Sequence, residues 1–130
     1  MRAKYHNRKV RTKDGVMDSS LEYHRYLYLL EQQKAGKISD LLRQVEFEII
    51  PQQTIQETVT LKTKIKTVTR VVERAVSYIA DFVYKKDGQT VIEDAKSEIT
   101  RKNRDYVMKR KLMRLHGHPI REVYSATEKV

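Results

Sequence analysis

The chain has 130 residues, a length that predicts one domain with a single hydrophobic core. It contains no cysteine, which excludes disulfides and cysteine-based zinc sites, and no apolar run approaches the ~20 residues of a membrane-spanning helix. Lysine and arginine number 27 against 17 aspartate and glutamate residues, giving a net charge of +10. This excess predicts a polyanionic partner, most simply nucleic acid. No secretory signal is visible, so we expect a cytoplasmic protein.

Basic residues without any acidic residue dominate the first 13 positions. The sequence Lys13-Asp14-Gly15 is typical of a turn and predicts a small hairpin from residues 8–12 and 15–17. Arg8 and Lys9 are candidate DNA contacts, and a solvated basic arm accounts for the same charge equally well.

A helix is predicted over residues 18–34, with Gly36 as its C-terminal stop. Its core-facing stripe is expected from three residues with i, i+4, i+7 spacing: Tyr23, Leu27 and Leu30. The sequence Ser19-Ser20-Leu21-Glu22 has the pattern of a capping box, which gives Glu22 a structural role. Arg25 is expected on the surface.

Residues 41–50 predict a strand, with Val45, Phe47 and Ile49 on its inward face. Residues 54–73 are rich in threonine and predict a β-ribbon or a long extended arm. Three lysines alternate with other residues near its middle: Lys62, Lys64 and Lys66. They are candidate DNA contacts that follow a phosphate backbone, or they protect an edge strand from aggregation.

Two strands joined by a tight turn are predicted over residues 75–96, because β-branched and aromatic runs flank an Asp-Gly pair. Side chains alternate faces along a strand, so Asp94 and Lys96 share one face and Glu93 points to the other. If the face of Asp81 matches that of Asp94, the hairpin sets two carboxylates and an ammonium group side by side. Neighbouring carboxylates repel unless a cation lies between them, and Mg²⁺ is the natural candidate because it takes hard oxygen ligands.

A basic helix is predicted from Thr100 to about His116, followed by a short strand over residues 120–124. Its apolar stripe is expected from three residues: Met108, Leu112 and Leu115. Cations cover much of the remaining surface, more than solubility requires, and we interpret this helix as facing DNA. The candidate DNA contacts are Arg101, Lys102, Arg104, Lys109, Lys111 and Arg114. A solvated charged face is the alternative.

The hairpin motif resembles that of the PD-(D/E)XK nuclease superfamily, which has an acid at the end of one strand and acid-x-Lys on the next. Here Ala80-Asp81 and Asp94-Ala95-Lys96 stand at these places, with Ala80 where proline is usual and Asp94 where glutamate is usual. Residues 4–26, 78–84 and 91–96 resemble a family of small phage-encoded nuclease-like proteins known as a domain of unknown function. The resemblance to Holliday-junction resolvases is looser.

This resemblance implies an α/β (α+β) fold with a restriction-endonuclease-like αβββαβ core, in which helices flank a mixed central sheet. The predicted element order agrees with it. It implies that Asp81, Asp94 and the Ala95 carbonyl hold Mg²⁺, for which Mn²⁺ would substitute. It implies that Lys96 orients or deprotonates the attacking water, or stabilises charge on the phosphate. It also implies that Glu22 joins or lies near the metal site, an alternative to its capping role.

Together these features predict a Mg²⁺-dependent DNA endonuclease that hydrolyses phosphodiester bonds, on branched DNA or on recombination and replication intermediates. The alternative is a non-catalytic or partner-dependent nucleic-acid-binding protein on the same scaffold. DNA is the expected partner and no membrane is expected. The sequence also allows a homodimer and a phage replication or packaging partner. A phage-encoded protein would act in the host cytoplasm.

Overall fold

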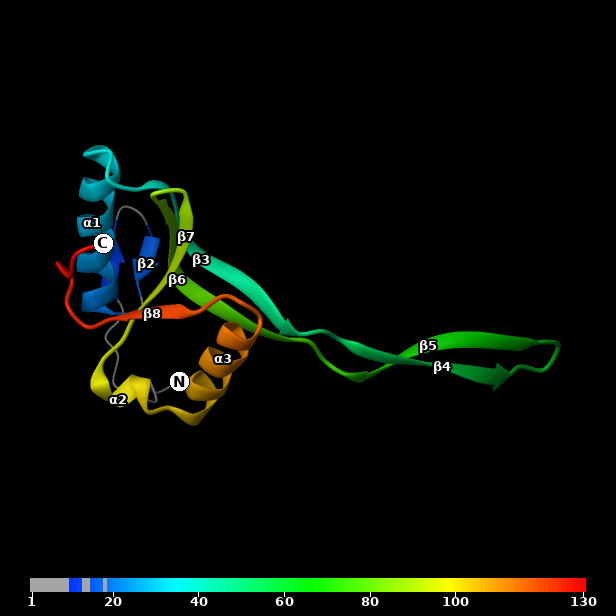
Figure 1. The fold of residues 1–130 in the computed structure, drawn as a ribbon. Helices are drawn as coiled ribbons and strands as arrows, with labels where there is room; N and C mark the ends of the chain where they lie inside the picture. Colours follow the sequence, from blue (N-terminus) through cyan, green and yellow to red (C-terminus); the bar gives the residue numbers. More distant parts are fainter. Residues whose placement is uncertain (1–9, 13–14, 18) are drawn as a thin grey trace.

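The computed structural model describes residues 10–12, 15–17 and 19–130 (Figure 1). Its centre is a mixed four-stranded sheet in the order β3-β6-β7-β8. The strands are β3 (Ser39–Ile50), β6 (Val76–Lys86), β7 (Gln89–Ala95) and β8 (Ile120–Val123). β6 runs antiparallel to both β3 and β7, and β8 lies parallel to β7. The predicted α/β class is therefore confirmed.

The helices are α1 (Ser20–Lys34), α2 (Glu98–Arg101) and α3 (Arg104–Leu115). The prediction of one long helix from Thr100 to His116 was wrong. The Asn103 side chain accepts a hydrogen bond from the backbone N–H of Tyr106 at 2.9 Å and caps a new helix, which separates α2 from α3. In the described parts of the chain, no helix is long and apolar enough to cross a membrane.

A small hairpin precedes α1, formed by β1 (Val10–Thr12) and β2 (Gly15–Met17). This agrees with the hairpin predicted from the turn sequence. Arg8 and Lys9, the candidate DNA contacts of this segment, lie outside the described residues.

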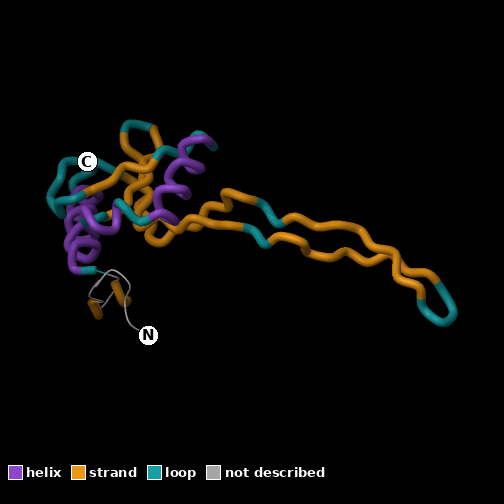
Figure 2. Tube along the Cα trace, turned by 90° about the horizontal axis from the view of Figure 1, so that it is seen from below, coloured by secondary structure: helices purple, strands orange, loops and turns teal. Residues whose placement is uncertain are grey.

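A second hairpin projects far from the sheet as a two-stranded ribbon, β4 (Gln53–Thr60) and β5 (Ile65–Glu73) (Figures 1 and 2). The ribbon continues the directions of β3 and β6, so the long antiparallel pair separates only at its base. The expectation of a ribbon is confirmed. The three lysines, however, do not lie along one strand: Lys62 and Lys64 occupy the turn at the tip, and Lys66 lies in β5 opposite Val59.

Two hydrophobic clusters hold the helices to the sheet. In the first, Leu29 of α1 packs with Ile38, Phe82 and Tyr84. The buried line of α1 is Glu22, Arg25 and Leu29, whereas the three residues of the predicted stripe are only half-buried. Polar groups occupy two of these buried positions, which apolar periodicity does not detect.

The second cluster holds α3 against the sheet through Tyr106 and Met113, which contact residues of β3, β6 and β7. The predicted stripe of α3 was wrong at two of its three positions. Met108 is 60% exposed and Leu115 is 79% exposed. The face of α3 that packs on the sheet carries Tyr106 and Met113, with Leu112 half-buried, and is not the most apolar stripe.

Candidate active site

The hairpin of β6 and β7 brings Asp81 and Asp94 together. Phe82 is paired with Glu93. Because the two strands are antiparallel, Asp81, which precedes Phe82, faces Asp94, which follows Glu93. The two carboxyl groups line the same pocket. The N–H of Ala95 donates to Asp81 Oδ2 at 2.9 Å.

These carboxyl groups line an open pocket of about 440 Å³ between the sheet and the α2–α3 segment. Tyr78, in the pocket wall, donates a hydrogen bond from its hydroxyl to Asp94 Oδ2 over 2.5 Å. The pocket is lined mainly by polar side chains, which include Gln44, Tyr78, Asp81, Asp94, Lys96, Asn103, Tyr106 and Lys109. A pocket of this character can admit a polar, charged ligand.

Lys96 completes the predicted motif. Its Nζ lies 3.3 Å from Asp94 Oδ2 and 4.2 Å from the centre of the Tyr106 ring. The backbone N–H of Lys96 donates to the carbonyl of Val123 at 2.9 Å, so β8 fixes the strand end that carries the lysine. The structure thus brings together the three side chains that the strand alternation singled out.

Glu22 reaches the same region from α1 through an intermediary, Gln44 of β3. The Gln44 side-chain amide donates to Glu22 Oε1 at 2.8 Å and lies 3.5 Å from Asp81 Oδ1. The backbone N–H of Glu22 also donates to Ser19 Oγ at 3.1 Å, as predicted for a helix cap. Glu22 therefore combines a position in the capped first turn with a side chain directed to Gln44.

Sequence reasoning did not identify Gln44. It is a polar residue on the exposed side of an alternating strand, which is ordinary. Its unusual property is a backbone φ of 51°, in the left-handed region that residues other than glycine seldom adopt. Such conformations cluster at functional sites, and here the conformation is found in the residue that links two carboxylates.

The carboxylates form a crowded acidic cluster. Burial raises the pKa of Asp81 well above its usual range, and the hydrogen bond and charge of Asp94 and the charge of Glu22 act in the same direction. The Ala95 N–H opposes this effect. Burial and the neighbouring Asp94 carboxylate also raise the pKa of the Tyr78 hydroxyl, which therefore stays protonated and donates.

Asp81 and Asp94 suit a hard divalent cation as oxygen ligands. In residues 10–12, 15–17 and 19–130, no group of three or more His, Asp or Glu side chains is arranged as a metal cage. Mg²⁺ commonly binds through one or two carboxylates and keeps several waters or substrate oxygens, so the pair meets its requirement. A cation between the carboxylates would also relieve their mutual repulsion.

Glu93 lies on the opposite side of β7 from this cluster and is fully buried. Arg25 of α1 donates to it from two nitrogens, Nε at 2.8 Å and Nη2 at 2.7 Å. Burial alone would lower the pKa of Arg25, but the hydrogen bond and charge of Glu93 outweigh it and raise that pKa. The expectation that Arg25 lies on the surface was wrong. An arginine can occupy a buried position where a carboxylate accepts hydrogen bonds from two of its nitrogens.

Further polar groups join this buried ion pair. Arg121 of β8 donates to Glu93 Oε2 at 3.2 Å, and the Tyr84 hydroxyl also donates to that oxygen. Arg25 donates to the carbonyls of Ala126 and Glu128, which holds the segment after β8 against α1. This network fixes the face of β7 opposite the pocket. Asp94, the residue next to Glu93 in the chain, is positioned on the pocket side by the same strand.

Glu122 of β8 fixes the other wall of the pocket. It accepts a hydrogen bond from the Tyr106 hydroxyl at 2.7 Å and lies 3.4 Å from Arg101 and 3.6 Å from Arg110. Burial would raise the pKa of Glu122, but hydrogen bonds from Tyr106 and Tyr124 and the two arginines lower it. The Tyr106 ring that contacts Lys96 is thereby held in place.

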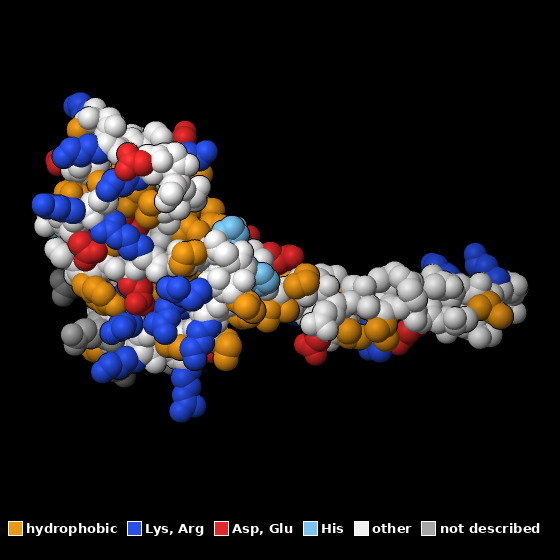
Figure 3. Space-filling view, in the orientation of Figure 1, with side chains coloured by type: hydrophobic (Ala, Val, Ile, Leu, Met, Phe, Trp, Pro, Cys, Tyr) orange, Lys and Arg blue, Asp and Glu red, His pale blue; other side chains and the backbone are white. Residues whose placement is uncertain are grey.

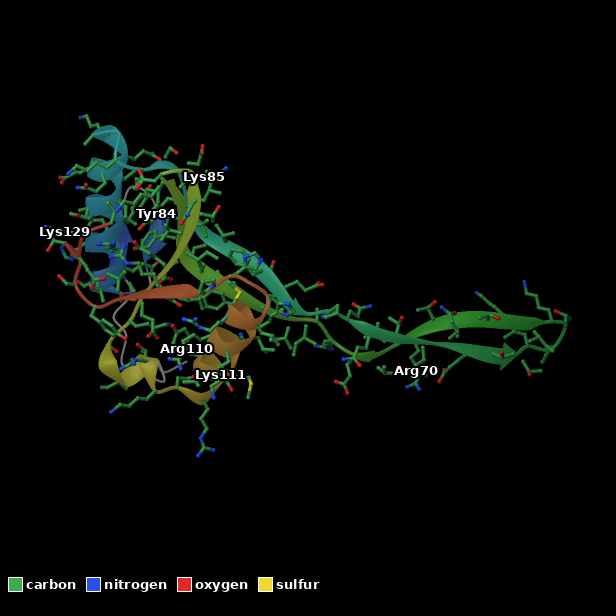
Figure 4. The ribbon with its side chains drawn as sticks, in the orientation of Figure 1. Arg70, Tyr84, Lys85, Arg110, Lys111 and Lys129 are labelled. Carbon is green, nitrogen blue, oxygen red and sulfur yellow. The ribbon has the colours of Figure 1, made fainter. Side chains whose placement is uncertain are left out.

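The predicted DNA contacts on the basic segment have different surroundings. Lys109 lines the pocket, and Arg101 is already paired with Glu122. The others are exposed on α2 and α3 or at their ends: Lys102, Arg104, Lys111 and Arg114. Figure 3 shows blue side chains gathered over this part of the body, and Figure 4 locates Arg110 and Lys111 on α3. The other three lysines lie at or near the tip of the β4–β5 ribbon, which projects away from the sheet (Figure 1).

The sequence was also compared with known proteins. One family model, described as a protein of unknown function (DUF1064), matches residues 2–128. The chain belongs to this family. No curated protein and no solved structure matches this DUF1064 protein. Membership of a family of unknown function, predicted from the residues, is confirmed, and membership of a nuclease superfamily stays a prediction.

Proposed function

We propose that this DUF1064 protein is a metal-dependent endonuclease that hydrolyses phosphodiester bonds in DNA. The observation that carries the proposal is the meeting of Asp81, Asp94 and Lys96 in one open polar pocket beside a basic helix. The acid and acid-x-Lys spacing on paired strands, with its resemblance to PD-(D/E)XK nucleases, supports it.

Different residues of the chain would bind the metal, orient its ligands and act on the water or phosphate. Asp81 and Asp94, with the Ala95 carbonyl, would hold Mg²⁺, which neutralises phosphoryl charge and supplies Lewis-acid activation when bound. The Tyr78 hydroxyl orients the Asp94 carboxylate, and the Ala95 N–H orients that of Asp81. Lys96 is directed into the pocket by Asp94, where its ammonium group can orient the attacking water or stabilise charge on the phosphate.

Nucleic acid as the substrate is supported by charge. The chain carries +10, and exposed cations on α2 and α3 stand beside the pocket. Lys109 is both a pocket residue and a cation, so it can contact the phosphate next to the one that is cleaved. Branched DNA and recombination or replication intermediates are the substrates that the looser resemblance to resolvases favours.

A second candidate is a non-catalytic nucleic-acid-binding protein, acting alone or with a phage replication or packaging partner. One observation favours it: in the described residues no group of three or more His, Asp or Glu side chains is arranged to hold a metal ion. Such a protein would bind DNA equally with and without divalent cations.

The test is a cleavage panel of duplex, single-stranded, flap and four-way-junction DNA, with Mg²⁺, Mn²⁺ or EDTA. We expect Mg²⁺-dependent cleavage by the natural chain and none by Asp94→Asn, which removes a ligand charge but preserves shape. The matched control is Asp87→Asn, the same chemical change in the exposed β6–β7 turn. Asparagine tolerates the left-handed backbone of that position, where φ is 52°.

Three results would reject the assignment. Cleavage that survives Asp94→Asn would point to another site or a contaminating nuclease. Binding to DNA with no cleavage of any substrate in either metal would favour the non-catalytic candidate, and activity that appears only with a co-purifying protein would favour its partner-dependent form.

A further inference from the structure

The β4–β5 ribbon receives little support from the rest of the described chain. β4 and β5 pair with each other, and no substantial packing joins them to another element (Figures 1 and 2). Apolar side chains along it remain exposed, among them Ile55, Ile65, Val71 and Val72. An isolated two-stranded ribbon is marginally stable in water, whereas three or more strands form a stable sheet. Among the described residues, the ribbon has no third strand to stabilise it.

The free edge of β4 is suited to pairing. Its sequence, Gln-Thr-Ile-Gln-Glu-Thr-Val-Thr, has one charged residue, Glu57, and neither proline nor glycine. Exposed edges are usually protected by lysines, prolines or bulges. β5 has such protection in Lys66 and Arg70, so β4 is the less protected of the two edges.

One face of the ribbon carries no charge at all. The register places directly opposite residues on the same face, and this face consists of Thr54, Gln56, Thr58, Thr60, Ile65, Thr67, Thr69 and Val71. On the other face, Arg70 and Glu57 form an ion pair at 2.8 Å. Figure 3 shows mainly white and orange atoms along the ribbon, with a few red and blue side chains on one margin and blue side chains at the tip. Like charges therefore do not oppose pairing along β4.

We propose that β4 pairs antiparallel with β4 of a second copy of this chain, forming a four-stranded sheet in the order β5-β4-β4-β5. The two-fold axis passes through Gln56, because an axis at Glu57 would set two glutamates directly opposite each other. Eight residues of β4 then supply about eight inter-strand hydrogen bonds, within the ~10 ± 5 of a typical protein interface. The contact is isologous and closes at two copies.

Charge complementarity favours this antiparallel arrangement. It brings the tip of each ribbon, with its three lysines, to the base of the other ribbon. Acidic residues outnumber basic ones at that base: Glu46, Glu48 and Glu73 against Arg74, all exposed. Such complementarity selects the orientation of pairing more than it adds affinity.

The ribbon also separates the two basic bodies. Eight residues of strand span about 26 Å at ~3.3 Å per residue. The Debye length at physiological salt is ~8 Å, so repulsion between bodies held this far apart is largely screened. Self-association through the ribbon is thus compatible with a charge of +10, and it does not depend on the proposed nuclease activity.

The test is sedimentation equilibrium of the full chain, freed of nucleic acid, across micromolar concentrations. We expect a species of twice 15.4 kDa. Gln56→Lys with Thr58→Lys should raise the dimer dissociation constant at least ~10-fold, because like charges then meet across the new strand pair. The matched control is Thr69→Lys with Thr67→Lys, which places the same charges on the same face at the partners of those positions in β5. Circular dichroism checks that both variants fold.

A second measurement does not depend on weakening the contact. The natural chain has no cysteine, so Gln56→Cys gives a single thiol on the proposed axis. Mild oxidation should link two copies of Gln56→Cys, but not of Thr69→Cys. A natural chain that stays monomeric throughout overturns the proposal, and so does a dimer unaffected by the β4 variant. A chain that stays monomeric and binds DNA more weakly after Lys62→Gln with Lys64→Gln assigns the ribbon to nucleic acid and also overturns the proposal.

Discussion

Glu93 and Asp94 are adjacent carboxylates whose neutralisation should have opposite consequences. Glu93→Gln is expected to destabilise the protein without touching the pocket. Asp94→Asn is expected to abolish cleavage while leaving stability nearly unchanged. The difference follows from the faces of β7 on which the two side chains lie.

The size of the stability loss expected for Glu93→Gln follows from the surroundings of the Glu93 side chain. The side chain is fully buried, as is that of Arg25, and three side chains donate to its carboxylate. Neutralising it leaves the Arg25 guanidinium buried without a counter-charge, which costs about 3–5 kcal/mol. For a chain of this length 1 kcal/mol corresponds to roughly 3 °C, so the melting temperature should fall by roughly 10–15 °C. Carbonyls of Ala126 and Glu128 still accept from Arg25, which favours the lower end of that range.

Asp94→Asn should change the free energy of unfolding by less than ~1 kcal/mol, because the amide oxygen can still accept from Tyr78 and repulsion with Asp81 is relieved. The assay is urea unfolding followed by circular dichroism, together with cleavage of the preferred substrate well below the melting temperature. Arg25→Met with Glu93→Gln provides the control: if the pair is coupled, the double variant loses less than the sum of the single changes.

A Glu93→Gln variant as stable as the natural protein, together with an unfolded Asp94→Asn variant, would contradict these expected effects. That result would mean that the register of β7 is shifted by one residue, which exchanges the two faces.

Three further outcomes are expected. Glu22→Gln should sharply reduce cleavage while shifting the melting temperature little, whereas natural activity in this variant would leave Glu22 only its place in the helix cap. Lys109→Gln should flatten the slope of log DNA affinity against log salt by about 1, and Lys85→Gln, remote from the pocket, should leave it unchanged. Asp81→Asn should raise the melting temperature of the metal-free protein and remove the stabilisation that Mg²⁺ gives the natural chain, because it eliminates one of the repelling charges. Equal Mg²⁺ stabilisation of this variant and the natural chain would contradict the metal site.

Local pattern was sufficient for much of the fold. Strand alternation and the Asp-Gly turn predicted the β6–β7 hairpin, and alternation alone placed Glu93 and Asp94 on opposite faces. These features depend on neighbours within a few residues, where the geometry of a strand or turn admits few choices. The ribbon and the cap of α1 by Ser19 were predicted in the same way.

Tertiary structure decided the rest, because the partners come from distant parts of the chain. Arg25 is buried only since Glu93, 68 positions away, meets it in the core. Gln44 joins the acidic cluster only through the pairing of β3 with β6. The Asn103 cap divided a helix that composition predicted as continuous, and packing on the sheet buried Tyr106 and Met113 in place of Met108 and Leu115. A sequence lists which polar groups need partners, but burial and long-range pairing determine which partners they find.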